Sequence, residues 1–197
     1  MLLRKMSMVL LSLGGMALLA GCDTFGTSPA PVASAPPVGR AIDYLNDDLA
    51  SLVFVVDLPA NLQPTPAGTL VTIAASASKG EHHVNARPAL VDGDGAAASL
   101  TAPEPGRTYH FLGFSDKDKT DIANLQKWAR GLPLTDAPVF ALSVVPKLCA
   151  ASPTDPTTAQ IAVLAVLPGG VVLAPVIARE PLSAALGASP LTPCAKR

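Results

Sequence analysis

Short runs of apolar and β-branched residues, separated by turn-forming residues, occupy most of the chain after residue 41. Each run has the length of a β-strand, and the spacing of the runs is typical of all-β domains. The eight runs cover residues 52–58, 69–75, 83–91, 97–101, 107–114, 139–145, 160–167 and 171–177. Pro88 lies within the third run and predicts either a sheet-edge strand or a break, because proline cannot donate to a ladder.

Two glycine-containing segments predict how neighbouring runs connect. Pro168, Gly169 and Gly170 separate the last two runs and predict a β-hairpin, because glycine adopts positive φ without steric cost. The segment 92–95 (DGDG) predicts a turn between the third and fourth runs.

One segment departs from the strand pattern and predicts a helix over about residues 116–131. Its apolar residues recur at three- and four-residue spacing and form one stripe, which consists of Ile122, Leu125, Trp128, Ala129 and Leu132. Ser115 is a suitable N-cap, and Gly131 and Pro133 are suited to ending the helix. Trp128 lies on the apolar stripe, so we expect its indole to anchor the helix on the core.

The expected fold class is therefore all-β: an antiparallel two-sheet sandwich of seven or eight strands with one inserted helix. A single helix is too few for an alternating parallel α/β fold, in which each crossover between parallel strands needs its own helix. The helix lies between two strand runs, so we expect it to cap a sheet end or an open sheet face.

The first 21 residues have the pattern of a signal peptide. Arg4 and Lys5 form a positive n-region, and an apolar stretch follows from Met6 to Ala20. This stretch is too short to span a bilayer comfortably, since about 20 apolar residues are needed.

The residues that follow the apolar stretch, Leu19-Ala20-Gly21-Cys22, match the lipobox of bacterial lipoproteins at every position. The signal region thus resembles that family. The resemblance implies a diacylglyceryl thioether on Cys22, cleavage after residue 21 and acylation of the new amino terminus. An ordinary secretory signal that happens to end in cysteine is the alternative. Three acyl chains exceed the two signals that stable anchoring requires, so we expect a palmitate-bearing protein held on the membrane through its lipid.

Residues 22–40 form the lipid anchor and a linker rich in proline, alanine and serine. Such a composition favours extended polyproline II segments. The remaining residues, 41–197, are expected to form the sandwich domain.

Composition excludes some classes of function. The formal net charge is −1, and no cluster of Lys and Arg follows the signal region, so nucleic acid is not an expected partner. Hydrophobic residues make up 49% of the chain, which argues against disorder driven by charge.

Cys149 and Cys194 remain after lipidation of Cys22, and we expect a structural disulfide between them. Exported proteins occupy compartments that permit disulfides. A reactive thiolate commonly lies near a histidine or in a Cys-x-x-Cys motif, and neither cysteine has such a neighbour in the sequence.

No motif in the chain specifies a catalytic or metal site, and no cofactor is expected. The weak metal candidates are Glu81, His83 and His110, since Glu81 and His83 share one face of a strand and His110 would join from another strand. No Gly-x-Ser-x-Gly elbow and no phosphate-binding loop occur, so the protein is not expected to be an enzyme.

The sequence predicts a membrane-anchored lipoprotein of the bacterial cell envelope that faces the periplasm. Its sandwich domain would bind or scaffold another envelope protein, as an assembly or secretion accessory component does. The host membrane, inner or outer, is left open. The alternative is a periplasmic module that binds a small ligand or a metal through the region of His83 and His110.

Overall fold

A six-stranded antiparallel sheet forms the first layer of the fold. The computed structural model describes residues 39–187 and 191–195, all of which lie in one compact unit. The strand order is β10-β9-β1-β6-β5, and β11 pairs with β9 as well. The strands are β1 (Val53–Pro59), β5 (Ala89–Leu90), β6 (Arg107–Gly113), β9 (Gln160–Leu167), β10 (Val171–Val172) and β11 (Ile177–Pro181).

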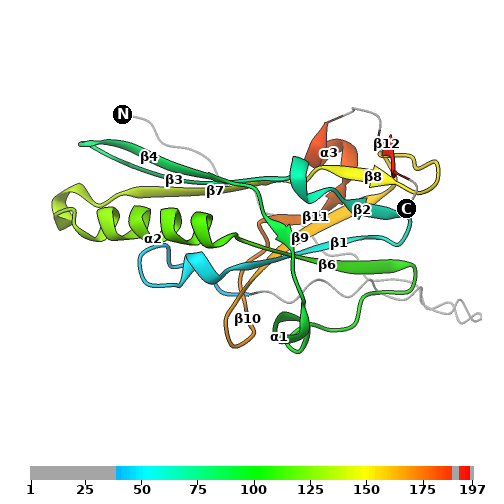
Figure 1. Cartoon of the computed structure of the whole chain (residues 1–197), viewed down its shortest axis with the longest axis horizontal. Helices are drawn as coiled ribbons and strands as arrows, with labels where there is room; N and C mark the ends of the chain where they lie inside the picture. The colour runs from blue at the N-terminus through cyan, green and yellow to red at the C-terminus, as the bar shows by residue number, and fades with distance from the viewer. Residues whose placement is uncertain (1–38, 188–190, 196–197) are drawn as a thin grey trace, which may run out of the picture. The chain divides into compact units, whose positions relative to one another are not determined.

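Two three-stranded sheets, arranged end to end, form the second layer (Figure 1). One has the order β4-β3-β7, with β3 (Leu70–Ala77), β4 (Gly80–Ala86) and β7 (Val139–Val145). The other has the order β12-β8-β2, with β2 (Leu62–Pro64), β8 (Leu148–Ala150) and β12 (Thr192–Pro193); β12 pairs with β8 in parallel.

A short irregular junction joins these two sheets, because prolines interrupt the ladders there. Pro66 begins the 3-10 helix η2 (Pro66–Gly68) between β2 and β3, and Pro146 separates β7 from β8. Hydrogen bonds bridge the gap: Thr65 donates its N–H to the Lys147 carbonyl at 2.6 Å, and Lys147 donates its N–H to the Thr69 hydroxyl at 3.1 Å.

The main hydrophobic core lies between the layers. The first sheet contributes residues such as Phe54 and Val163, and the second layer contributes Ile73 and Leu148, all at most 3% exposed. Strand β9 is buried over seven of its eight residues, which explains its nearly continuous apolar sequence.

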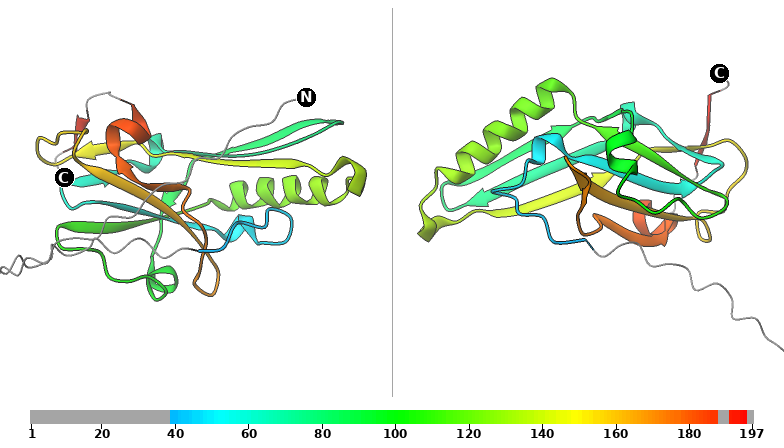
Figure 2. Two further views of the ribbon diagram at one scale, coloured as in Figure 1. Left: turned by 180° about the vertical axis from the view of Figure 1, so that it is seen from behind. Right: turned by 90° about the horizontal axis from the view of Figure 1, so that it is seen from below.

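The long helix α2 (Asp116–Arg130) covers the inner face of the β4-β3-β7 sheet at its hairpin end (Figures 1 and 2). Ile122, Leu125 and Ala129 are its buried apolar residues. The Ser115 side chain accepts the N–H of Asp118, so Ser115 is the N-cap that the sequence predicts.

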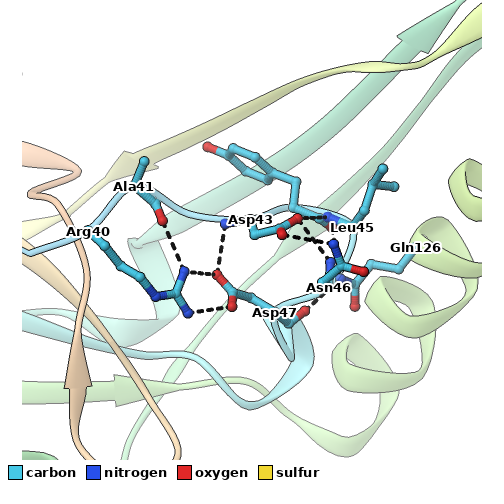
Figure 3. Close-up of polar contacts among 8 residues, drawn as sticks. Arg40, Ala41, Asp43, Leu45, Asn46, Asp47 and Gln126 are labelled. Atoms are coloured by element: carbon cyan, nitrogen blue, oxygen red, sulfur yellow. Dashed lines mark hydrogen bonds and ion pairs between the residues drawn. The ribbon is translucent and has the colours of Figure 1, made fainter.

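The segment 40–51, which includes the 3-10 helix η1 (Leu49–Ser51), lies along the side of α2 nearest to β7 and is held there by polar contacts (Figure 3). Arg40 donates two hydrogen bonds to the Asp47 carboxylate, and the buried Gln126 amide donates to the carbonyls of Tyr44 and Asp47 at 2.9 and 2.8 Å. The chain therefore enters the domain through a segment that is fastened directly to α2.

The outer face of the six-stranded sheet carries a second, smaller core. Val55, Leu164 and Val166 are buried there beneath the loop 91–106, which contains the helix α1 (Asp94–Ala97). Gly93 precedes this helix, and a Cβ at this residue would lie 2.2 Å from the Phe111 ring. Glycine is therefore required for the close approach of the loop to the sheet.

A buried ionic network lies beside this smaller core. Asp57 is 4% exposed and accepts hydrogen bonds of 2.8 Å from Arg107 Nε and from Arg179 Nη2. Arg179 also donates to Glu104 in the loop at 2.7 Å. The network thus fastens the loop 91–106 to the sheet through charged groups from four segments of the chain.

The fold is all-β, antiparallel and sandwich-like, with one long helix inserted, as the sequence predicts. Residues 39–187 and 191–195 contain twelve strands, of which seven have five or more residues. The predicted runs 139–145 and 160–167 coincide with β7 and β9, and the predicted run 83–91 divides at Pro88 into β4 and β5. The predicted hairpin at Gly169 and Gly170 is confirmed: both residues have φ 81°, and β10 pairs with β9.

Two predicted strands differ from the structure. Residues 97–101 are not a strand: α1 ends within them, because the run begins with two alanines, which favour helix, and Thr101 is its only β-branched residue. The segment 92–95 accordingly leads into α1 rather than turning between strands. The run 171–177 divides into β10 and β11, with Pro175 in the interruption.

The predicted disulfide between Cys149 and Cys194 is present, with the two Cα atoms 4.8 Å apart. It fastens the C-terminal strand β12 to β8. The predicted signal peptide, Cys22 and most of the predicted linker lie outside the described residues. Within the part of the chain that the structure covers, no helix has the length and apolar character needed to cross a membrane.

Candidate binding groove beside strand β4

A groove of about 410 Å³ lies between strand β4 and helix α2. We call it the β4 groove. Four consecutive residues of β4 and five residues of α2 line it: His82, His83, Val84, Asn85, Lys117, Asp121, Asn124, Leu125 and Trp128.

Strand β4 forms an edge of its sheet. It pairs with β3 on one side, and among the described residues no strand pairs with its other side. The β3–β4 hairpin has a two-residue turn after the pair Ala77 and Gly80, so main-chain groups alternate between β3 and the free edge from that pair onward. By this alternation the N–H and C=O groups of Glu81, His83 and Asn85 face the free edge.

The opposite edge strand, β7, is bordered by other parts of the chain. The Tyr44 ring stacks on the Phe140 ring with centroids 5.1 Å apart. A small hollow of about 290 Å³ lies beside Leu142 and is lined by Ala41, Ile42, Tyr44 and residues 174–176. The two edges of this sheet thus differ: β7 is flanked by the segment 40–51, and β4 borders an open groove.

Four of the five α2 residues that line the β4 groove form one row: Lys117, Asp121, Asn124 and Trp128. Their spacing of four, three and four residues places them on one stripe of the helix. This stripe lies on one flank of the buried residues, and Gln126 and Arg130, which hold the segment 40–51, lie on the other.

Trp128 and His82 meet at the floor of the groove. Their ring centroids are 4.1 Å apart with an interplanar angle of 40°. Trp128 is half-buried and packs against the main core, so anchoring the helix accounts for only part of its surroundings. One side of the indole contacts the core, and the residue also lines an open surface.

The groove carries little net charge. Lys117 Nζ and the Asp121 carboxylate form an ion pair, and this hydrogen bond raises the pKa of Lys117. Both side chains are largely accessible, at 82% and 41% of their surface, so the pair is of little consequence for folding. The two charges nevertheless neutralise each other at the rim of the groove.

The weak metal candidates do not come together. The side chains of Glu81 and His83 lie on the outer face of the β4-β3-β7 sheet by the alternation of the strand. His110 lies on β6 in the six-stranded sheet, opposite Val56. Within residues 39–187 and 191–195, no three histidine, cysteine, aspartate or glutamate side chains form a cluster that would hold a metal ion.

His110 has a distinct environment. Its Nε2 atom is buried without a hydrogen-bond partner. Burial lowers the pKa of His110, and a backbone hydrogen bond at Leu62 opposes this shift in part. The neutral imidazole is therefore the favoured form in the folded protein.

A second hollow, of about 470 Å³, lies at the disulfide end of the fold. Residues 150–154, Pro156, Leu191 and Pro193 line it. Its surface is mainly apolar and it offers few side-chain groups for specific hydrogen bonds, so we do not assign a function to it.

The loop that joins α2 to β7 projects at the other end of the domain. Leu134 in the 3-10 helix η3 (Leu134–Asp136) is 97% exposed, and Val139 is 72% exposed. The Asp136 carboxylate accepts the N–H of Ser78 at 2.8 Å and so ties this loop to the β3–β4 turn.

The sequence interpretation missed the β4 groove. The stripe of Lys117, Asp121, Asn124 and Trp128 is visible in the sequence as a repeat of four, three and four residues. Its partner surface is not, because the exposure of the β4 edge depends on which strands pair.

Comparisons of the chain with protein-family models, with curated proteins and with solved structures find no significant match.

Proposed function

We propose that this protein is a lipid-anchored protein of the bacterial cell envelope, and that its sandwich domain binds another envelope protein through the β4 groove. The groove itself is the observation that carries the binding role. It combines an open strand edge, a half-buried indole and a stripe of polar side chains on a rigid helix.

Two features support a location in the bacterial cell envelope. The signal region matches the lipobox at residues 19–22. The disulfide between Cys149 and Cys194 fits an exported protein, because such bonds persist mainly in oxidising compartments.

The composition of the groove supports protein recognition. Surfaces that bind proteins commonly present an aromatic residue within a polar rim. Trp128 supplies the aromatic surface here, and Lys117, Asp121 and Asn124 supply the rim.

The arrangement of the chain supports presentation of this surface at a distance from the membrane. Residues 23–40 would extend about 50 Å at roughly 3 Å per residue in the polyproline II conformation. The linker meets the domain at Arg40, and the segment that follows is fastened to α2, the helix that carries one wall of the groove.

Two experiments test the proposal. Metabolic labelling with a palmitate analogue should mark the wild-type protein and leave Cys22→Ala unlabelled; equal labelling of both would refute the lipid anchor.

A photo-crosslinking amino acid placed at Asn124 should capture an envelope protein reproducibly in intact cells. The same group at Ala123, one residue along the helix and outside the groove, is the matched control. Equal capture at both positions would refute the groove as the binding surface.

A further inference from the structure

The main-chain groups at the free edge of β4 allow a specific mode of binding. Strand β4 has seven residues and lies at the sheet edge over its whole length. Edge strands of β-sheets are usually protected from pairing with another chain by lysine, proline or a β-bulge. The β4 sequence, GEHHVNA, contains neither lysine nor proline, and its pairing with β3 runs without a register shift.

We propose that the β4 groove binds an extended segment of a partner protein by adding it as a strand to β4. The inference rests on the proposed function and specifies its mode of recognition. The added strand would exchange main-chain hydrogen bonds with Glu81, His83 and Asn85, which supply affinity in this kind of recognition. Its side chains on the inner side would lie over the α2 stripe, with one apolar side chain over Trp128.

Charge complementarity indicates the chemistry of the partner segment. Lys117 and Asp121 neutralise each other, so the groove favours a strand with uncharged, hydrogen-bonding residues toward the helix. The chain's own linker is a poor occupant. Pro29, Pro31, Pro36 and Pro37 lack the N–H that a ladder requires.

The position of α2 disfavours a second copy of the chain as the occupant. Helix α2 packs more closely against β4 than against β3. Antiparallel pairing of two β4 strands about a two-fold axis would place both α2 helices on the same face of the joined sheet, each beside its own β4. The Trp128 and Lys117 side chains of both copies would then compete for the space between the two helices.

The test uses the mature lipidated protein, purified in detergent, and a phage-displayed library of random peptides of about twelve residues, longer than a typical strand. Enriched peptides are then synthesised with N-methyl groups on alternate residues, in the two possible registers. Strand addition requires that methylation in one register abolish binding and that methylation in the other preserve it, because only alternate N–H groups face β4.

Two variants and one mapping experiment locate the bound peptide. Asn124→Trp fills the groove and should weaken peptide binding by about ten-fold or more, whereas Ala123→Trp should leave it within about two-fold. Hydrogen exchange should show new protection of the Glu81, His83 and Asn85 amides when peptide is bound.

Three outcomes of the peptide experiments would overturn the inference. They are failure to enrich any peptide, peptide binding that is equally sensitive to methylation in both registers, and protection that maps to another surface. Concentration-dependent dimerisation that Asn124→Trp abolishes would also overturn it, in favour of a second copy as the occupant. The cellular crosslinking at Asn124 distinguishes these results from failure of the proposed function, since crosslinks there would persist if a partner binds the groove in another way.

Discussion

Replacement of Asp57 by alanine tests whether the buried ionic network fastens the loop 91–106 to the sheet. The Asp57 carboxylate is 4% exposed and accepts hydrogen bonds of 2.8 Å from Arg107 and Arg179. The side chains of these two arginines are 11% and 19% exposed. Asp57→Ala would leave both guanidinium groups without their buried counter-ion, and such a loss costs about 3–5 kcal/mol of stability.

Two variants calibrate this magnitude. Glu104 is 40% exposed and bonds Arg179 from the loop, so Glu104→Gln should cost about 1 kcal/mol. Lys117→Ala removes an ion pair on the exposed side of α2 and should leave the stability unchanged within the error of the measurement. The expected order of destabilisation is therefore Asp57→Ala, then Glu104→Gln, then Lys117→Ala.

Thermal unfolding of the purified protein supplies the assay. A loss of about 3–5 kcal/mol corresponds to a fall in Tm of roughly 6–20 °C for a domain of this size. Hydrogen exchange should also show faster exchange of the amides in residues 91–106. A change below about 1 kcal/mol for Asp57→Ala would contradict the reasoning, because the two arginines would then find adequate solvation without the carboxylate.

Three further predictions concern other parts of the fold. Cys194→Ser should destabilise the protein by about 4 kcal/mol in the chain-entropy model, since the bonded cysteines are 45 residues apart; urea unfolding measures this, and a loss below about 1 kcal/mol would contradict it. Trp128→Ala should cost about 1.5–3 kcal/mol, less than the 3–5 kcal/mol typical of a fully buried aromatic residue, because the indole is half-buried. Burial lowers the pKa of His110 in the folded state below its ordinary value of 6.5. The contribution of neutral His110 to the stability of the folded protein is therefore present above pH 6.5 and is lost as the pH falls through the folded-state pKa. The stability of His110→Gln relative to wild type should accordingly improve on acidification from neutral pH, and an unchanged difference across this range would contradict the assignment.

The elements that the sequence predicts well are those with strong local patterns. Strands β7 and β9 have their predicted bounds, and α2 begins after its predicted N-cap, Ser115. In each case the residues that decide the element are close together along the chain. The segment 97–101 lacked such a pattern, and its assignment as a strand was wrong.

The candidate site residues that the sequence suggested also fall into two groups, one that the structure brings together and one that it separates. Cys149 and Cys194 were paired by elimination, because two cysteines remain once Cys22 is assigned to the lipid, and the structure joins them. Glu81, His83 and His110 were grouped by residue type alone. The structure places His83 on the outer face of the β4-β3-β7 sheet and His110 opposite Val56 in the six-stranded sheet, so these two histidines do not share one site.

The local sequence by itself determined the strand-rich class, the position of the long helix and the pairing of the last two free cysteines, because periodicity, capping and residue counts express them directly. The tertiary structure alone decided that β4 is an open edge, that β7 is flanked by the segment 40–51 and that Trp128 lies half in the core and half in a groove. The buried ionic network also joins distant segments. Its side-chain bonds from Asp57 to Arg107, from Asp57 to Arg179 and from Arg179 to Glu104 connect residues that are 50 to 122 positions apart in the sequence. Strand order, edge exposure and buried charge pairing arise from contacts between distant segments, and no local pattern encodes which segments will be neighbours.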